Sequence, residues 1–419
     1  MLLSATALAE WRKFWPLPFA AGLGYATAVM YVYAMGPFIE PISQEFGWSR
    51  ARVSSGITIA AFFSAIFCIP IGMLVDRIGP RRVGLFGALM MAACVALLGS
   101  ATGTETNWVM LWGLLAVSTL FVQATVWTSA VTSRFEHSRG LALAITLSGA
   151  SLSATIFPVL ATWLIAQTGW REAFTLMAGV WIALVFPVLF ISFRGANDRL
   201  GNPQTPVTHT VKALSGVSLG QGLRSPALYK LVMAGGFFSF TAIGIVVHFV
   251  PILTDAGAEP LAAAGVASLV GVFSVIGRLG TGFLLDRLPG HLVGGVAFII
   301  PIIACMLLLL DGSNPLSQAV AAAIFGLTLG SEVDVIAYLA ARYFGLRNFG
   351  ALYGAMVMAL SLGVAFGPLG AGVAYDLYGG YASFLYLTMG LMAVSAVALF
   401  SLGSTPDAAE LEAGSVVAR

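Results

Sequence analysis

The sequence predicts an all-α polytopic membrane protein with twelve transmembrane helices in two six-helix pseudo-repeats. Three observations support this fold class: an apolar composition, twelve long apolar runs, and a second half that repeats motifs of the first. The chain of 419 residues is 59% hydrophobic and 9% charged, whereas soluble globular proteins carry about 25% charged residues. This composition excludes a soluble enzyme, a nucleic-acid-binding protein and a disordered chain.

Twelve apolar runs are long enough to cross a bilayer, for which a helix needs about 20 residues. They are not the alternating segments of about 10 residues that form membrane barrels. Glycine and proline fall inside several runs, as membrane helices allow. The predicted spans are 14–40, 53–75, 83–101, 108–133, 140–166, 174–193, 227–253, 262–286, 292–310, 317–341, 350–376 and 383–402.

The distribution of Lys and Arg predicts that both termini are cytoplasmic, because positive residues collect in cytoplasmic loops. With the N-terminus inside, sixteen of the 20 basic residues lie on the inner side and three lie in outer loops. The remaining one, Arg278, lies within a span. We therefore expect a multi-pass protein of the inner membrane.

The sequence contains no common motif of a catalytic, nucleotide-binding or metal-binding site. The three cysteines lie in apolar runs without paired or metal-ligand spacing, so we expect packed thiols and no metal site. No P-loop, nucleophile elbow or zinc-protease motif occurs. We therefore expect neither an enzyme nor a cofactor.

Motifs of the first half recur in the second half at a nearly constant offset. Residues 72–77 read Gly-Met-Leu-Val-Asp-Arg and match residues 282–287, Gly-Phe-Leu-Leu-Asp-Arg, at an offset of 210. Arg134 matches Arg342 at an offset of 208. Parallel six-helix repeats are typical of secondary transporters, whose substrate site lies near the midplane where the repeats meet.

One long polar stretch divides the predicted spans six and six. We read it as a cytoplasmic linker, because it carries asparagine, proline and aspartate between apolar runs. The predicted organisation is an N-terminal bundle at 1–193, the linker at 194–226, a C-terminal bundle at 227–403 and a cytoplasmic tail at 404–419.

These residues also carry a family resemblance. The segment 72–82 has the pattern Gly-x-Leu-x-Asp-Arg-x-Gly-x-Arg-Arg, which resembles the signature loop of the major facilitator superfamily, and 282–287 is its degenerate copy. The resemblance covers essentially the whole chain. It implies alternating access, in which two six-helix bundles rock about a central cavity, and a monomer.

Three shorter stretches resemble the monocarboxylate transporter and oxalate/formate antiporter branch of that superfamily. They are Gln-Glu-Phe-Gly-Trp-Ser-Arg at 44–50, Val-His-Phe-Val-Pro at 247–251 and Gly-Arg-Leu-Gly-Thr-Gly at 277–282. The sequence departs from the branch at Ser274, because the branch typically has an acid four residues before its span-eight arginine. The resemblance implies a small organic anion as substrate.

Residues that serve the scaffold are expected to recur in both repeats, whereas residues that serve one substrate are not. We interpret the recurring charged residues as cytoplasmic clasps that pair across helix ends and separate during rocking. The alternative is a second binding site. The predicted clasp residues are Asp76, Arg77, Arg81, Arg134, Asp286, Arg287 and Arg342.

Arg278 is the leading candidate for binding a substrate anion. Its counterpart at offset 210 is Cys68, so it does not recur. It lies eight residues before Asp286, about 12 Å up the helix. A charge at such a depth costs about 2.5–3.5 kcal/mol, and a guanidinium binds a carboxylate with two hydrogen bonds without losing its own proton. In the resembled branch an arginine here binds the substrate carboxylate; the alternative is a buried ion pair with an acid on span ten.

Span ten supplies two deep acids, Glu332 and Asp334, which do not recur in the first repeat. Asp334 lies eight residues before Arg342, so it should reach the depth of Arg278. The two acids are separated by about 200° around the helix. One of them is expected to pair with Arg278 or carry a proton, while the other locks onto a neighbouring helix; which acid does which stays open.

His248 is the one histidine inside a span, and its counterpart in the first repeat is Phe38. In the resembled branch a histidine here contributes to the substrate pocket, and an imidazole also suits proton coupling. The alternative is a packing residue. The weaker pocket candidates are Tyr31, Gln123, Trp127 and Ser274.

Together these features predict a secondary active transporter that moves a small organic monoanion, either an aliphatic monocarboxylate or an aromatic acid. One cation in the membrane favours one substrate carboxylate. Proton symport is the expected coupling, with protons and the bilayer as further partners. An anion exchanger or an exporter of the same superfamily is the alternative, and a transporter-like ligand sensor is the alternative of another class.

Overall fold

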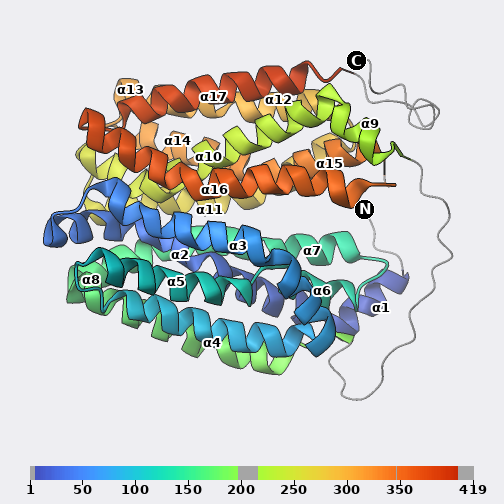
Figure 1. The fold of residues 1–419 in the computed structure, drawn as a ribbon, viewed down its shortest axis with the longest axis horizontal. Coiled ribbons are helices and arrows are strands. Elements are labelled where there is room, and N and C mark those ends of the chain that lie inside the picture. The colour runs from blue at the N-terminus through green and yellow to red at the C-terminus, as the bar shows by residue number, and fades with distance from the viewer. Residues whose placement is uncertain (1–4, 197–215, 346, 404–419) are drawn as a thin grey trace. The chain divides into compact units, whose positions relative to one another are not determined.

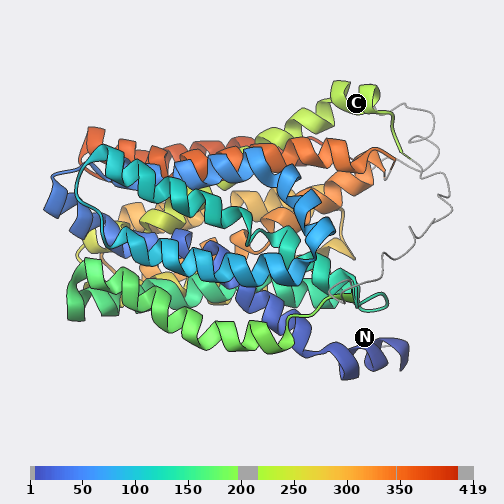
Figure 2. The ribbon, with the colours of Figure 1, turned by 60° about the horizontal axis from the view of Figure 1, so that its bottom comes forward.

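The computed structural model describes residues 5–196, 216–345 and 347–403, apart from the side chains of residues 5, 68–70, 72 and 76. All regular elements of this described part are α-helices. The chain divides into two compact units, 1–202 with 259–271 and 203–258 with 272–419. Figures 1 and 2 show the helices of each unit.

The first unit holds the first eight helices. Its centre is α2, which packs along α8 and also against α7, while α3 lies along α5 and α4 contacts both α5 and α8. The helices are α1 (Ala5–Phe14), α2 (Pro16–Phe46), α3 (Arg50–Ile78), α4 (Pro80–Leu98), α5 (Glu105–Leu120), α6 (Ala124–Thr132), α7 (Arg139–Leu147) and α8 (Gly149–Ser192).

The second unit is built around α10, which packs along α16 and α17, while α12 and α13 also lie against α17. Phe238 of α10 and Phe298 of α12 meet at 4.4 Å between ring centroids inside its apolar core. The helices are α9 (Leu219–Arg224), α10 (Pro226–Asp255), α11 (Pro260–Leu285, which belongs to this unit from residue 272), α12 (Gly290–Ile299), α13 (Pro301–Asp311), α14 (Pro315–Leu329), α15 (Glu332–Phe344), α16 (Phe349–Tyr378) and α17 (Ala382–Phe400).

Ten helical segments of the described chain are long and apolar enough to cross a membrane. One of them, Arg139–Ser192, holds two predicted spans, because Gly169 interrupts α8 with φ 79° and ψ 163°, a conformation open to glycine. The predicted span 53–75 lies within α3. The all-α polytopic fold class predicted from the sequence is confirmed.

Spans four and ten are both interrupted, although the sequence predicts an unbroken run at 108–133 and at 317–341. Span four is divided between α5 and α6 at residues 121–123, and span ten is divided between α14 and α15 at residues 330–331. At the first interruption Gln123 is extended, and the Trp127 indole N–H donates to the Val122 carbonyl at 2.8 Å. The offset of 208 places Gln123 opposite Ser331, so the interruptions occur at matching places.

The N-terminal segment forms a helix of its own, which the sequence did not predict. Glu10 of α1 accepts hydrogen bonds from the backbone N–H groups of Glu136, His137 and Ser138, just before α7 begins. Trp11 packs on Phe135 at 5.1 Å between ring centroids. These contacts fasten α1 to the loop between α6 and α7.

The predicted linker and tail are described only in part. Residues 197–215 of the linker 194–226 and the tail 404–419 lie outside the described residues. Within the linker, α9 begins at a capping box in which Ser218 and Gln221 bond each other's backbone N–H groups.

Candidate functional site

Two glycines bring α11 and α14 into backbone contact in the second unit. A Cβ atom built on Gly277 would lie 2.0 Å from the Leu327 carbonyl oxygen, and one built on Gly330 would lie 2.0 Å from the Ser274 carbonyl oxygen. Only residues without a side chain allow this approach. As a result, α15 begins directly beside the part of α11 that carries Arg278.

A hydroxyl pair closes the same contact. Thr281 and Ser331 lie 2.6 Å apart between their Oγ atoms, and both side chains are buried. Ser331 also donates to the Leu327 carbonyl at 2.7 Å. The interruption between α14 and α15 is therefore held in one position against α11.

Arg278 and Asp334 form an ion pair across this contact. Arg278 Nη1 lies 3.3 Å from Asp334 Oδ1 and 3.4 Å from Oδ2. The Arg278 side chain is 15% exposed and that of Asp334 is 33% exposed. Arg278 Nε is buried without a hydrogen-bond partner, so the guanidinium has an N–H group that can still donate to a ligand. The pair has the residue types that bind an anion, and its contacts are longer than those of a tight carboxylate–guanidinium pair.

Glu332 turns to a different neighbour from Asp334. It is 4% exposed, and its side chain hydrogen-bonds with Ser239 of α10. Its other oxygen, Oε1, is buried without a hydrogen-bond partner. Both acids lie in the first turn of α15, where the helix dipole favours negative charge. As their positions around the helix predict, the two acids face different neighbours. Asp334 contacts α11 and Glu332 contacts α10.

This cluster of Arg278, Asp334, Glu332 and Ser239 can bind an anion and hold protons. The guanidinium stays charged throughout, while each carboxyl group can exist as an acceptor or as a protonated donor. Ser274, one turn before Arg278, is 3% exposed, and its carbonyl oxygen faces Gly330.

His248 is completely buried, at 0% exposure, and is held from both sides of its ring. Nδ1 lies 2.7 Å from the Tyr381 hydroxyl and Nε2 lies 2.9 Å from the Pro368 carbonyl oxygen. A carbonyl only accepts, so Nε2 carries the proton and Nδ1 accepts from Tyr381. His248 therefore connects α10 to α16 and to the start of α17, which is the packing role given as the alternative in the sequence analysis.

The three pocket candidates of the first unit lie in different surroundings. Tyr31 of α2 makes an edge-to-face contact with Trp112 at 6.1 Å between ring centroids. Gln123 donates through Nε2 to Ser64 Oγ at 3.1 Å. Trp127 is 0% exposed and packs on Gly24, where a Cβ atom would fall 2.3 Å from its ring. The indole of Trp127 thus supports the interrupted span.

Two of the four predicted clasp residues of the first unit, Arg81 and Arg134, contact the chain at the end of α8 and just beyond it. Arg81 donates to the carbonyls of Phe190 and Phe193, the latter at 2.6 Å, and Arg134 donates to the Gly195 carbonyl at 2.9 Å. The Asp76 side chain lies outside the described residues, and Arg77 is exposed.

The clasp residues of the second unit are exposed at helix ends. Asp286 and Arg287 follow α11, with the Arg287 guanidinium 3.6 Å from the Phe283 ring centroid. Arg342 lies in the last turn of α15, 5.9 Å from the Tyr338 ring centroid. The separation of these residues during rocking stays a prediction.

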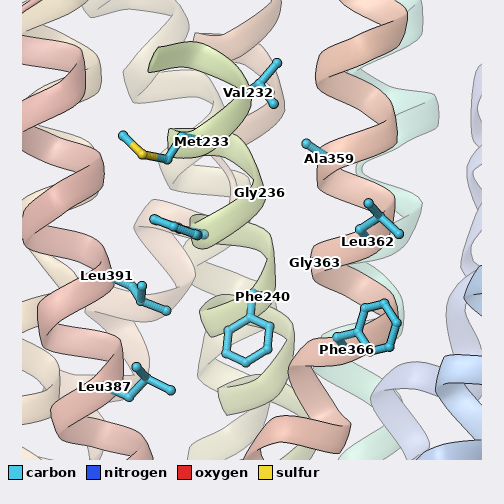
Figure 3. Close-up of a pocket in the computed structure, with 11 residues that line it drawn as sticks. Val232, Met233, Gly236, Phe240, Ala359, Leu362, Gly363, Phe366, Leu387 and Leu391 are labelled. Carbon is cyan, nitrogen blue, oxygen red and sulfur yellow. The ribbon is translucent and has the colours of Figure 1, made fainter. Parts of the chain in front are cut away.

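An apolar groove in the second unit is distinct from this cluster (Figure 3). It lies between α10, α16 and α17, and Gly236 of α10 faces Ala359 of α16 within it. No charged side chain lines it, so it offers no partner for an anion. Its lining residues are Val232, Met233, Gly236, Phe237, Phe240, Ala359, Leu362, Gly363, Phe366, Leu387 and Leu391.

Ser239 of the cluster was not predicted from the sequence, and neither was the Thr281–Ser331 pair beside it. Thr281 lies in the stretch 277–282 that resembles the monocarboxylate branch, which is a signal that could have identified it. Ser239 has no comparable signal, because its role depends on how α10 faces α15.

Comparison with known proteins gives one consistent result. A family model described as Major Facilitator Superfamily matches residues 21–368. A Rattus norvegicus protein named Monocarboxylate transporter 13 is 27% identical over 392 residues, which are 91% of this chain and 87% of the relative. A Bacillus subtilis protein named Uncharacterized MFS-type transporter YcxA is 24% identical over 370 residues, 86% of this chain and 88% of the relative.

Among solved structures, a bacterial homologue of the human lysosomal transporter Spinster matches with a TM-score of 0.73. The match covers 92% of this chain and 96% of that one at 16% identity. A likeness at this identity shows a shared fold.

Proposed function

The chain belongs to the major facilitator superfamily, and we propose that this transporter carries a small organic monoanion across the inner membrane by alternating access. Arg278 binds the substrate carboxylate, and protons move in the same direction as the anion. Both termini are cytoplasmic in this proposal, and the working unit is a monomer of an N-terminal and a C-terminal bundle.

The observation that carries the proposal is the environment of Arg278. A guanidinium within a membrane span needs a partner, and the partner here is a carboxylate at 3.3 Å on a neighbouring helix, with 33% of its side chain exposed. A partly exposed pair with long contacts can open for a competing carboxylate. The relatives named Monocarboxylate transporter 13 support the same substrate class.

The remaining predicted residues have supporting parts in the proposal. Tyr31, Gln123, Trp127 and Ser274 are the further candidates for contacts with the substrate. His248 holds α10 to α16 through the Pro368 carbonyl. The recurring charged residues at helix ends act as clasps between successive conformations.

Flux across a sealed bilayer tests this function. Purified protein is reconstituted into proteoliposomes, and the uptake of radiolabelled formate, lactate and benzoate is followed with an inward proton gradient. We expect one of these anions to accumulate and a protonophore to abolish the accumulation, with empty liposomes and Arg278→Gln as controls.

Three other outcomes contradict parts of the proposal. Uptake that requires an anion inside the vesicle identifies an exchanger. Binding of an anion without any flux identifies a sensor. Uptake of amines or neutral solutes, with no response to any acid, excludes the organic-anion class.

A further inference from the structure

We propose that Asp334 is the exchangeable counter-ion of Arg278, that the substrate carboxylate takes its place, and that the displaced Asp334 takes up one proton while Glu332 stays uncharged throughout. This inference rests on the proposed function. It assigns different roles to two acids that lie two residues apart, and it predicts an electroneutral symport of one proton with each monoanion.

The position of the counter-ion follows from the contact between α11 and α14. The monocarboxylate branch, which this sequence resembles, places an acid one turn before the arginine, and Ser274 stands there in this chain. Ser274 is buried, and its carbonyl oxygen faces Gly330. Because Gly330 lies so close, Asp334 four residues later reaches Arg278 from another helix. The negative charge that is missing from α11 is thus supplied by α15.

Asp334 and Glu332 differ in how far they are buried. Asp334 retains 33% exposure and contacts Arg278, so it can exchange a proton with water. Glu332 is 4% exposed, and its Oε1 atom has no hydrogen-bond partner. An ionised carboxylate that is buried with one unsatisfied oxygen is costly, whereas a protonated carboxyl group needs fewer acceptor contacts. Glu332 therefore stays protonated and bonded to Ser239.

Charge balance favours this assignment over one in which Asp334 stays ionised and Glu332 carries the proton. In the empty transporter, Arg278 and ionised Asp334 cancel and Glu332 is neutral. In the loaded transporter, Arg278 and the substrate anion cancel, and both acids are protonated. The O–H bond that forms on Asp334 uses a proton from water, and no bond of the substrate breaks. Both states are neutral, which a low-dielectric site requires. If Asp334 stayed ionised beside Arg278 and Glu332 carried the proton instead, both states would hold a net negative charge.

The other titratable groups around Glu332 leave this balance unchanged. Tyr353 of α16 interacts electrostatically with both acids and is the one titratable group of that helix near them. On α10, Lys230 and His248 each lie nine residues from Ser239, about 13 Å along the helix. On α12 the titratable residue is His291, beside Gly290, which faces Tyr338. The sequence of α14 contains no titratable residue.

Proton linkage of binding tests the assignment. Calorimetric titrations of the purified full-length protein with sodium formate, lactate and benzoate are run at pH 7 in buffers of different ionisation enthalpy. For any anion that binds, we expect uptake of about one proton per anion by the wild type and by Glu332→Gln, and about none by Asp334→Asn. The affinity of Asp334→Asn should also rise, because no internal carboxylate competes for Arg278.

The pH dependence of affinity gives an independent readout. One linked proton makes the wild-type affinity fall about tenfold for each unit of rising pH, and Glu332→Gln should keep this slope. The affinity of Asp334→Asn should not change with pH. If Asp334→Asn fails to fold, Asp334→Ser is used in its place. A slope lost in Glu332→Gln and kept in Asp334→Asn overturns the assignment, as does anion binding without proton uptake. If no anion binds the wild type, the proposed function itself fails.

Discussion

Gly330 lies so close to Ser274 that a Cβ atom on Gly330 would be 2.0 Å from the Ser274 carbonyl oxygen and 2.8 Å from the backbone nitrogen of Arg278. These atoms belong to the backbone of α11, so no side-chain rotation can relieve the overlap. The position of α15, with both of its acids, depends on this contact.

Gly330→Ala should therefore separate α11 from α14. Overpacking of this kind costs about 1–3 kcal/mol, so we expect a lower melting temperature in detergent and weaker anion binding. Gly280→Ala is the matched control, because it lies on α11 with nothing within 4 Å of its Cβ position. Equal melting temperatures for the two variants would show that the backbone contact does not hold the site.

Tyr381→Phe should destabilise the second unit without weakening anion binding. The change removes the hydroxyl that lies 2.7 Å from His248 Nδ1, and an unsatisfied buried acceptor costs about 1–3 kcal/mol. The melting temperature should fall in this variant and stay unchanged in Tyr386→Phe, where the tyrosine is 63% exposed. Weaker binding at an unchanged melting temperature would instead assign His248 to the substrate site.

Acid should release α1 from the loop before α7. Partial burial acts to raise the pKa of Glu10, but hydrogen bonds from the backbone of His137 and Glu136 and from the side chains of His137 and Ser138 outweigh it and lower the pKa from 4.5 to about 2. A depressed carboxyl pKa stabilises the folded state above the unfolded value. The stabilisation is present above about pH 4.5 and is lost as the pH falls toward 2.

Amide hydrogen exchange of residues 136–138, corrected for the intrinsic rate at each pH, measures this release. Protection should be full at pH 7 in the wild type and fall over that acid range, whereas Glu10→Gln should lack it at every pH. Glu136→Gln is the control, because its exposed carboxyl group lies in the same loop. If the amides of residues 136–138 were as protected in Glu10→Gln as in the wild type at pH 7, the Glu10 carboxylate would not be what holds this loop.

The sequence predicts the fold class and the spans well, because each apolar run is long and motifs recur at matching positions in the two repeats. The shared depth of Arg278 and Asp334 also follows from residue counting, since each lies eight residues from a charged helix end. These are one-dimensional properties of a helix, and they need no knowledge of packing.

The interruptions of spans four and ten could not be predicted in the same way. Phe121, Val122 and Gly330 are residues that an unbroken membrane helix also accepts. The first interruption depends on an indole hydrogen bond to Val122, and the second lies beside the close contact between Gly330 and α11. The partners of Glu332 and His248 likewise depend on neighbouring helices, which a single sequence does not show.

A thermal-shift screen that includes the Arg278→Gln variant tests whether Arg278 binds the carboxylate of an organic anion. Wild type and variant are compared against organic acids, amines and neutral solutes. A ligand at 100 times its dissociation constant stabilises a protein by about 2.7 kcal/mol. We expect a monocarboxylate to raise the melting temperature of the wild type and to leave that of the variant unchanged. An equal response of both proteins, or stabilisation by neutral or cationic compounds alone, would contradict this expectation.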